Sequence, residues 1–209
     1  MLSGHPPENE QTRPMSRDEI LAILKDSGAL RTGHFILTSG LHSDTYVQCA
    51  QVLQYPWRAE TLCAALAEKV RAQATEIDMV VSPAMGGVIV GYEMGRQLGV
   101  PAVFFERVDG VFTLRRDFTI PAGARCLMVE DVVTTGLSSR ECMAAARAEG
   151  GDVAAEACLV DRSGGRAELG VPLVSLLELD APAYDPDALP PHLRDIPAVK
   201  PGSRKLGAA

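Results

Sequence analysis

The sequence predicts an α/β fold in which a parallel β-sheet is flanked by helices. Short apolar segments, such as residues 78–82, 100–106 and 125–130, alternate with segments of helical pattern. Strands covered on both faces are apolar along their whole length, and strands that alternate with helices form parallel sheets. The 209 residues suffice for one ordinary domain with small additions.

The N-terminal part differs from this alternating pattern. Residues 1–14 are polar and contain prolines, which predicts a flexible arm. Ser16 and Glu19 have the spacing of a capping box, so we expect a helix to begin there. Residues 34–52 predict two short strands around a turn, and a helix follows over residues 56–74.

The remaining elements continue the alternation. Helices are expected over residues 87–98 and 137–149, and strands over residues 153–160 and 171–179. The proline-rich residues 182–201 predict a segment that wraps over the surface.

Composition limits the classes of function. A formal charge of −7 argues against broad nucleic-acid binding, although it permits an anionic small molecule. The five cysteines have no C-x-x-C spacing, so buried free thiols are expected. No apolar run is long enough to cross a membrane, and the first residues lack the apolar core of a secretory signal. We therefore expect a cytoplasmic protein without a membrane partner.

Residues 129–138 carry the strongest functional pattern. An apolar strand runs into Glu130 and Asp131, and a Thr/Gly/Ser turn then opens a helix. Ligands of open α/β sheets bind at the carboxyl ends of strands, and free amides at a helix N-terminus bind phosphate. Paired carboxylates accept hydrogen bonds from the vicinal hydroxyls of a sugar. The pattern therefore predicts a site for a phosphorylated ribose, and the alternative is two solubilising acids before an ordinary helix cap.

These residues resemble the signature of the type I phosphoribosyltransferases, which use phosphoribosyl pyrophosphate (PRPP). The resemblance implies that Glu130 and Asp131 bind the ribose hydroxyls of PRPP and take part in catalysis. It also implies that a loop surrounds the 5-phosphate, formed by Val132, Val133, Thr134, Thr135, Gly136, Leu137 and Ser138.

Two further segments resemble the orotate phosphoribosyltransferases within that family. Residues 35–46 match the pattern F-x-L-x-S-G-x-x-S-x-x-Y of a hairpin that covers the base, here called the hood, and residues 160–165 match V-D-R-x-x-G. The implied orotate contacts are Ser39, Tyr46, Thr134 and Arg162. A guanidinium can bind the orotate carboxylate with two hydrogen bonds. The alternatives are a surface arginine that caps a turn and an ordinary exposed hairpin.

Residues 82–87 resemble the loop that binds the leaving diphosphate in this family. The resemblance implies that Ala84, Met85 and Gly86 contact PRPP, and it suggests a strained or cis peptide at Ala84–Met85. The alternative is a simple strand-to-helix turn.

The chain departs from the family pattern at three places. Thr38 and Gly86 stand where many orotate enzymes have lysines. The segment that corresponds to their mobile catalytic loop, residues 106–117, contains no lysine or histidine. Its basic residues are Arg107, Arg115 and Arg116.

We expect these arginines to neutralise the diphosphate of PRPP, with Arg115 as the catalytic one. An alternative is that residues 111–114 form a regular hairpin strand, which makes the arginines structural surface charge.

The resemblance divides the chain into four parts. They are an arm at residues 1–14, a helix and hood hairpin at 15–55, a phosphoribosyltransferase core at 56–180 and a C-terminal wrap at 181–209. The implied function is transfer of phosphoribose from PRPP to orotate in pyrimidine (UMP) synthesis, by a homodimer. Mg²⁺ is expected to bind through substrate oxygens and water, without a protein metal site. The rivals are transfer to another nucleobase and a PRPP-sensing regulator without catalysis.

Overall fold

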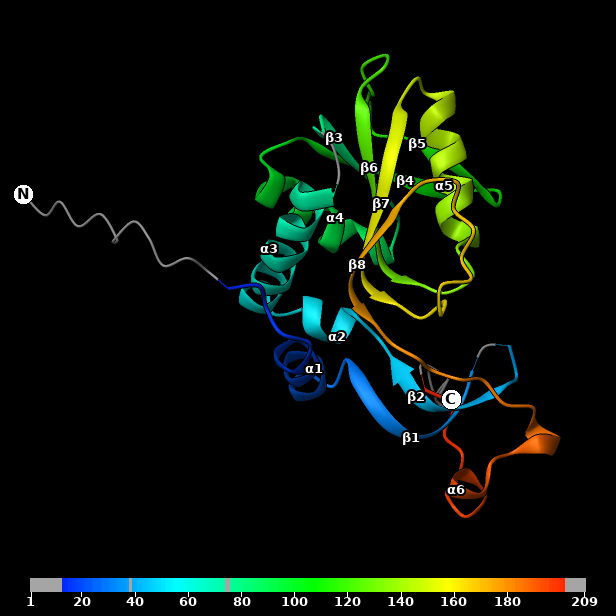
Figure 1. Ribbon diagram of the computed structural model, residues 1–209. Coiled ribbons are helices and arrows are strands. Elements are labelled where there is room, and N and C mark those ends of the chain that lie inside the picture. The colour runs from blue at the N-terminus through cyan, green and yellow to red at the C-terminus, as the bar shows by residue number, and fades with distance from the viewer. Residues whose placement is uncertain (1–12, 38, 74–75, 202–209) are drawn as a thin grey trace, which may run out of the picture.

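The computed structural model describes residues 13–37, 39–73 and 76–201. Its centre is a six-stranded sheet with the strand order β5-β4-β3-β6-β7-β8 (Figure 1). Every neighbouring pair is parallel except β4 and β5, which confirms the expected parallel sheet. The strands are β3 (Met79–Pro83), β4 (Ala102–Val108), β5 (Val111–Leu114), β6 (Arg125–Val133), β7 (Asp152–Asp161) and β8 (Leu173–Glu178).

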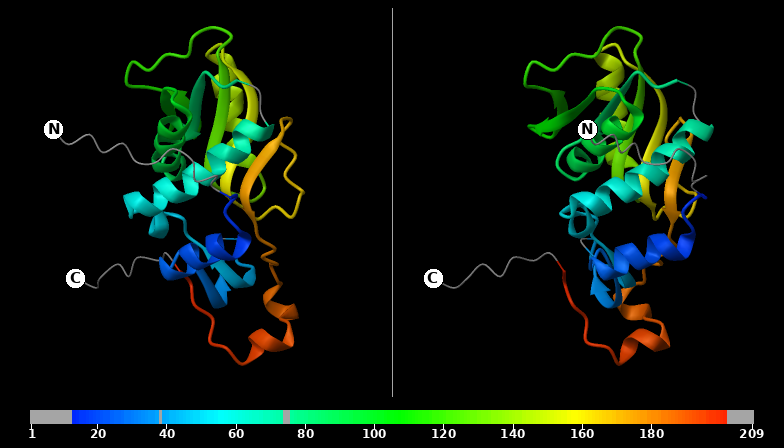
Figure 2. Two further views of the ribbon diagram at one scale, coloured as in Figure 1. Left: turned by 60° about the vertical axis from the view of Figure 1, so that its left-hand side comes forward. Right: turned by 90° about the vertical axis from the view of Figure 1, so that its left-hand side faces the viewer.

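Helices cover both faces of this sheet, with α3 and α4 on one side and α5 on the other (Figures 1 and 2). The helices are α1 (Arg17–Asp26), α2 (Ala50–Leu53), α3 (Pro56–Gln73), α4 (Gly86–Leu98), α5 (Leu137–Ala148) and α6 (Pro191–Arg194), with a 3₁₀ turn η1 at Pro186–Ala188. The capping box at Ser16 and Glu19 is present, and α1 begins at Arg17 as expected. None of the helices in the described ranges has the length and apolar character needed to cross a membrane.

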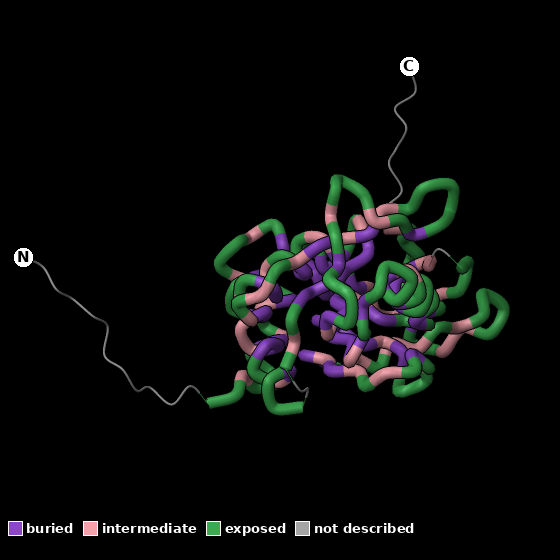
Figure 3. The backbone as a smooth tube through the Cα atoms, turned by 90° about the horizontal axis from the view of Figure 1, so that it is seen from above, coloured by how far each residue is buried: buried purple, intermediate pink, exposed green. Residues whose placement is uncertain are grey.

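Alternating side chains of the strands build two apolar layers. Val80 and Leu127 point into the layer that contains α3 and α4, whereas Val81 and Met128 point into the layer that contains α5. All four side chains have no exposed surface. Figure 3 shows buried positions concentrated in the middle of the molecule, with exposed turns around them. The sheet is therefore a rigid platform for whatever its strand ends carry.

The hood is a two-stranded antiparallel sheet of β1 (Leu30–Ile36) and β2 (His42–Val47). The C-terminal segment adds to both of its edges. The amide of Val199 donates to the carbonyl of His34 at 2.8 Å, and the amides of His42 and Tyr184 each donate to the other residue's carbonyl, at 2.8 and 2.7 Å. The C-terminal wrap thus completes the hood by backbone pairing, and the views of Figure 2 keep the two segments together.

His34 links the hood to the C-terminal segment through its side chain. It is buried in β1, its Nδ1 donates to the carbonyl of Ile196 at 2.7 Å, and its Nε2 lies 2.5 Å from Nδ1 of His42. The pair therefore joins the hood to the C-terminal segment and belongs to the structure of the hood.

Candidate active site

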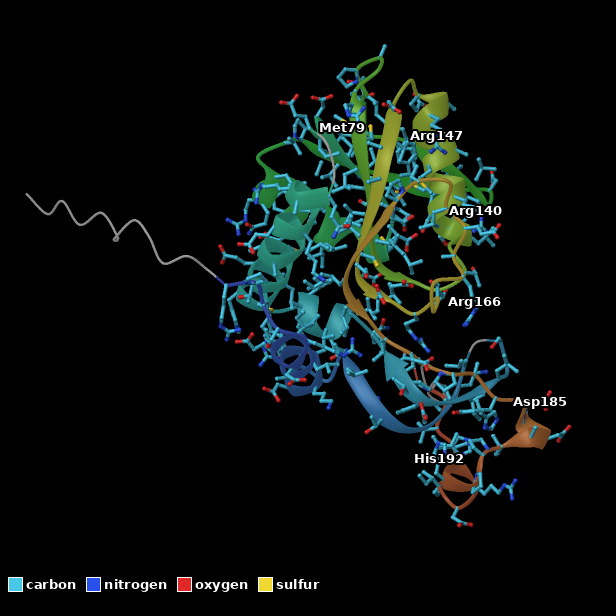
Figure 4. All side chains as sticks on the ribbon, viewed as in Figure 1. Met79, Arg140, Arg147, Arg166, Asp185 and His192 are labelled. Carbon is cyan, nitrogen blue, oxygen red and sulfur yellow. The ribbon has the colours of Figure 1, made fainter. Side chains whose placement is uncertain are left out.

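The candidate site lies where the carboxyl ends of the parallel strands face the hood. Figure 4 shows Met79, the first residue of β3, and Arg147, in the last turn of α5, at the far end of the core. Arg166, which follows β7, lies at the opposite end toward the hood. The strands thus run toward the hood, and their last residues face it.

Glu130 and Asp131 lie in the second half of β6, which extends to Val133, three residues beyond the expected end of the strand. Oε1 of Glu130 accepts a hydrogen bond from the Ser139 hydroxyl at 3.3 Å. Oδ1 of Asp131 accepts one from the amide of Val132 at 2.9 Å. Pairing with β7 continues through Glu130 and Val132, whereas pairing with β3 ends at Met128, so the backbone of the two acids is held on the β7 side.

Burial disfavours the ionised form of both acids. It raises the pKa of Glu130 to about 8, and the nearby charges of Glu156 and Asp131 add to this rise. Burial also raises the pKa of Asp131, while the hydrogen bond from the Val132 amide acts in the opposite direction. A ligand that donates hydrogen bonds stabilises the ionised form of such buried carboxyl groups, and the hydroxyls of a ribose are donors of this kind.

The phosphate loop follows directly. Thr134, Thr135, Leu137 and Ser138 are exposed, and the hydroxyl of Thr135 accepts from the amide of Leu137 at 3.4 Å. Gly136 has φ +71°, and a side chain there would lie 2.5 Å from Leu169. Only glycine both adopts this positive φ readily and leaves room for Leu169. Exposed hydroxyl-bearing residues thus lie at the start of α5, where helix N-termini favour anions, and binding of the 5-phosphate there stays a prediction.

The predicted diphosphate loop connects β3 to α4 and lies close to Asp131. The peptide bond between Ala84 and Met85 is cis, which confirms the expectation for this position. A Cβ atom at Gly86 would lie 2.8 Å from Oδ1 of Asp131, and one at Gly87 would lie 3.0 Å from the carbonyl of Val129. Because these glycines allow close approach, the loop packs against the cradle of residues 129–138.

Arg162 approaches the cradle from the end of β7. Its amide donates to the carbonyl of Val133 at 2.8 Å, which ties the two strand ends together. Nε of Arg162 is buried and has no hydrogen-bond partner among the described residues. Burial lowers the pKa of this guanidinium, and Tyr46 of the hood acts in the opposite direction. The arginine thus lies between cradle and hood with a buried side-chain donor that no described residue satisfies.

The hood supplies the other residues expected around the base. Tyr46 lies at the end of β2, with its ring centroid 5.6 Å from that of Phe35. Ser39 is exposed in the turn, where its hydroxyl accepts from the amide of Leu41 at 3.4 Å. The structure thus brings Tyr46 near Arg162, while none of the described interactions links Ser39 to the core. Thr38 lies outside the described residues.

Comparison with known proteins tests the implied family. Residues 53–180 match the model of the phosphoribosyl transferase domain. Orotate phosphoribosyltransferase of Methylorubrum populi is 58% identical over 92% of this chain and 98% of its own length. That of Phenylobacterium zucineum is 56% identical over 92% and 99%. The crystal structure of orotate phosphoribosyltransferase from Aeropyrum pernix has 27% identity and a TM-score of 0.67, covering 77% of this chain and 93% of its own.

The chain belongs to the orotate phosphoribosyltransferase family.

This member of the orotate phosphoribosyltransferase family has a regular hairpin where the sequence suggested a mobile loop. The Asp109–Gly110 turn has φ values of +51° and +85°, and Phe112 of β5 is buried. An Asp-Gly turn of this kind matches the twist of paired strands. The alternative of a regular strand at Val111–Leu114 is therefore the one observed.

The three arginines of the hairpin all pair with glutamates. Arg116 lies 2.9 Å from Glu106, and Arg115 lies 3.8 Å from the same carboxylate. Arg107 lies 2.5 Å from Glu141 and packs 4.0 Å from the ring centre of Phe112. The positive charge of Arg107 also acts on Glu130, where it partly opposes the rise in pKa that burial causes. Roles for these arginines in PRPP binding and catalysis stay predictions.

Some residues around this family member's site were not singled out from the sequence. Glu156 and Ser139 lie buried behind Glu130, and the thiol of Cys49 donates to the carbonyl of Asp131 at 3.8 Å. Each belongs to an apolar or helical stretch and carries no local motif. Residues 155–161 of β7 are all buried, so a glutamate within this apolar strand is the one signal in the sequence that could have indicated Glu156.

Within residues 13–37, 39–73 and 76–201, no three His, Cys, Asp or Glu side chains come together as a metal site. All five cysteines are buried and free, as expected.

Proposed function

We propose that this chain transfers the phosphoribosyl group of PRPP to orotate, giving orotidine 5-monophosphate and diphosphate in pyrimidine synthesis. One observation carries the choice of acceptor. Nε of Arg162 is buried without a partner at the end of β7, beside the cradle. An unpaired buried donor costs about 1–3 kcal/mol, which a carboxylate ligand recovers. Orotate is a uracil that bears such a carboxylate.

The chemistry assigned to the cradle is electrostatic. Orotate N1 attacks C1 of PRPP as diphosphate leaves, so positive charge develops on the ribose. The carboxyl groups of Glu130 and Asp131 face the ribose hydroxyls and hold the sugar while its ring flattens. The exposed loop of residues 134–138 fixes the 5-phosphate at the start of α5. No covalent nucleophile is required.

We propose that Mg²⁺ arrives bound to the diphosphate of PRPP, as part of the substrate. The chemistry of the ion supports this, because Mg²⁺ usually keeps water and substrate phosphate ligands. The protein's own part is to supply positive charge beside the diphosphate. Arg107 fits this part best of the three hairpin arginines, because its field already reaches Glu130.

We propose a homodimer in which α4 faces a second copy of the chain. Met85, Ile89 and Tyr92 follow a helical spacing and are 83%, 50% and 70% exposed. Beside them lies an apolar hollow of about 460 Å³, lined in part by Phe104 and Phe118. Monomeric proteins seldom expose such a patch. Sedimentation of the purified chain tests the proposal, and a monomer at micromolar concentration contradicts it.

We place the protein in the cytoplasm. Five free cysteines, with none in a disulfide, are usual in a reducing compartment.

An acceptor assay tests the proposed reaction. The purified chain is mixed with PRPP, Mg²⁺ and orotate, or with uracil, adenine or hypoxanthine in its place. We expect diphosphate release with orotate alone. Turnover with a neutral base but not with orotate contradicts the proposed acceptor, and tight PRPP binding without any turnover favours the regulator.

A further inference from the structure

A buried glutamate stands directly behind the cradle. Glu156 lies in the middle of β7 with no exposed surface, between Ala155 and Ala157. Oε1 accepts a hydrogen bond from the Ser139 hydroxyl at 2.7 Å, and Oε2 has no partner among the described residues. An apolar side chain would occupy this position at lower cost in folding free energy. Packing alone does not account for a carboxyl group here.

Ser139 bridges this glutamate to the cradle. Its hydroxyl is 2.7 Å from Oε1 of Glu156 and 3.3 Å from Oε1 of Glu130. A serine hydroxyl carries one proton, so it can donate to only one of two carboxyl groups at a time. It can accept from the other only if that carboxyl group is protonated. The arrangement therefore suits two carboxyl groups that share one additional proton.

The shared proton can lie on Glu130 or on Glu156, the two ends of this series of hydrogen bonds. In one arrangement Glu130 is protonated and donates to Ser139, which donates to the carboxylate of Glu156. In the other arrangement Glu156 is protonated and donates to Ser139, which donates to the carboxylate of Glu130. Only the second arrangement leaves Glu130 able to accept hydrogen bonds from the ribose hydroxyls with both of its oxygens.

We propose that Glu156 is a positioning residue that takes the proton of Glu130, through Ser139, when the ribose of PRPP binds. The O–H bond of Glu130 breaks as its proton moves to Ser139, and the proton of Ser139 moves to Glu156. No proton leaves the site and its net charge is unchanged. The proposal rests on the proposed function, because PRPP is the ligand that it requires.

The charges around the pair are compatible with either position of the proton. Burial raises the pKa of Glu130 to about 8 and that of Glu156 to about 7. These values are close, and the two protons belong to the pair rather than to either group. The other charged or ionisable groups near the pair are Arg107 on β4, Asp131 on β6, Arg140 and Cys142 on α5, and Cys158 and Asp161 on β7. The two arginines lower the pKa of the neighbouring carboxyl groups, and the acids raise it.

The variant Glu156→Gln tests the proposal, because glutamine keeps the size of the side chain but takes no proton. Without this acceptor, Glu130 has to release its proton to solvent when PRPP binds. At a pH at which Glu130 is still protonated, we expect PRPP binding to release a proton to the buffer in Glu156→Gln, whereas in the wild type the proton stays within the pair. Calorimetry in two buffers of different ionisation enthalpy measures this difference. Cys142→Ala, a change in the same buried surroundings, is the control and releases no more protons than the wild type. Equal proton release in the wild type and Glu156→Gln, or an equal increase in the control, overturns the proposal.

Infrared spectra supply a readout that does not depend on turnover. In the PRPP complex of the wild type at pH 7, a protonated carboxyl band should remain, and it should be absent from the complex of Glu156→Gln. A wild-type complex without that band overturns the proposal. If Glu156→Gln does not fold, Ser139→Ala serves instead. It removes the bridge between the two carboxyl groups and should lower kcat/KM for PRPP; an unchanged kcat/KM overturns the proposal. Absence of orotate turnover in the wild type contradicts the proposed function instead.

Discussion

The PRPP cradle and the proposed orotate pocket are built in different ways. The cradle is one contiguous segment, residues 129–138, at the end of a strand paired on both sides. The pocket combines Arg162 after β7 with Tyr46 of the hood, and the hood in turn depends on the C-terminal segment. In the proposed arrangement, PRPP binds to the rigid core, and the acceptor binds to segments that are far apart in the sequence.

This difference predicts which substrate each substitution should affect. A substitution in the cradle should affect PRPP whatever the acceptor is. A substitution in the pocket should affect orotate and leave PRPP binding intact. Changes in the hood and C-terminal segment should act more weakly, because they alter the position of side chains rather than remove a ligand contact.

The largest effect is expected from Asp131→Asn. Asparagine keeps the acceptor for the amide of Val132 but lacks the charge that faces the ribose. We expect kcat/KM for PRPP to fall by about 100- to 1,000-fold, as on removal of one group that stabilises a charged transition state. Asp117→Asn is the control, because Asp117 is exposed with φ +56°, which asparagine tolerates. A defect confined to the KM for orotate contradicts the role of Asp131.

A smaller effect is expected at the arginine hairpin. Arg107→Ala should lower kcat by about tenfold, because it removes a positive charge near Glu130 and the proposed diphosphate site. Arg116→Ala is the matched change, since Arg116 lies in the same hairpin but pairs with Glu106 at 2.9 Å. It should change kcat by less than about threefold. Steady-state kinetics of the two variants separate the assignments, and the reverse order contradicts them.

The smallest effect is expected from Val199→Pro. Proline lacks the amide that donates to the carbonyl of His34, so one edge of the hood loses a backbone hydrogen bond. The KM for orotate should rise about threefold to tenfold, in line with a net loss of about 1 kcal/mol. Val199→Ala keeps the amide and serves as control. Hydrogen exchange at Ile36, whose amide donates to Val199, should accelerate only in the proline variant; equal exchange in both would contradict the role of this bond.

The sequence predicts those features that depend on residues close together along the chain. The cradle, the capping box and the cis peptide at Ala84–Met85 are local, because a strand end, a turn and a helix start follow one another along the chain. The Asp109–Gly110 turn is equally local, and the hairpin that it closes was predicted only as an alternative.

Features that depend on distant segments were not predictable in this way. His34 is buried because the C-terminal segment pairs with β1, which no local pattern at residue 34 indicates. Glu156 meets Ser139 only because α5 packs across β6 and β7. The partnerless Nε of Arg162 likewise becomes visible only when cradle and hood are in place.

Binding of two ligands to Arg162→Ala tests the separation of cradle and pocket most directly. Ribose 5-phosphate occupies the cradle alone, whereas orotidine 5-monophosphate occupies the cradle and the pocket. Calorimetry should show that Arg162→Ala leaves the Kd for ribose 5-phosphate unchanged and raises that for orotidine 5-monophosphate by about 10- to 100-fold, as for a lost hydrogen bond to a charged group. Equal weakening of both ligands, or no weakening of either, would contradict the account.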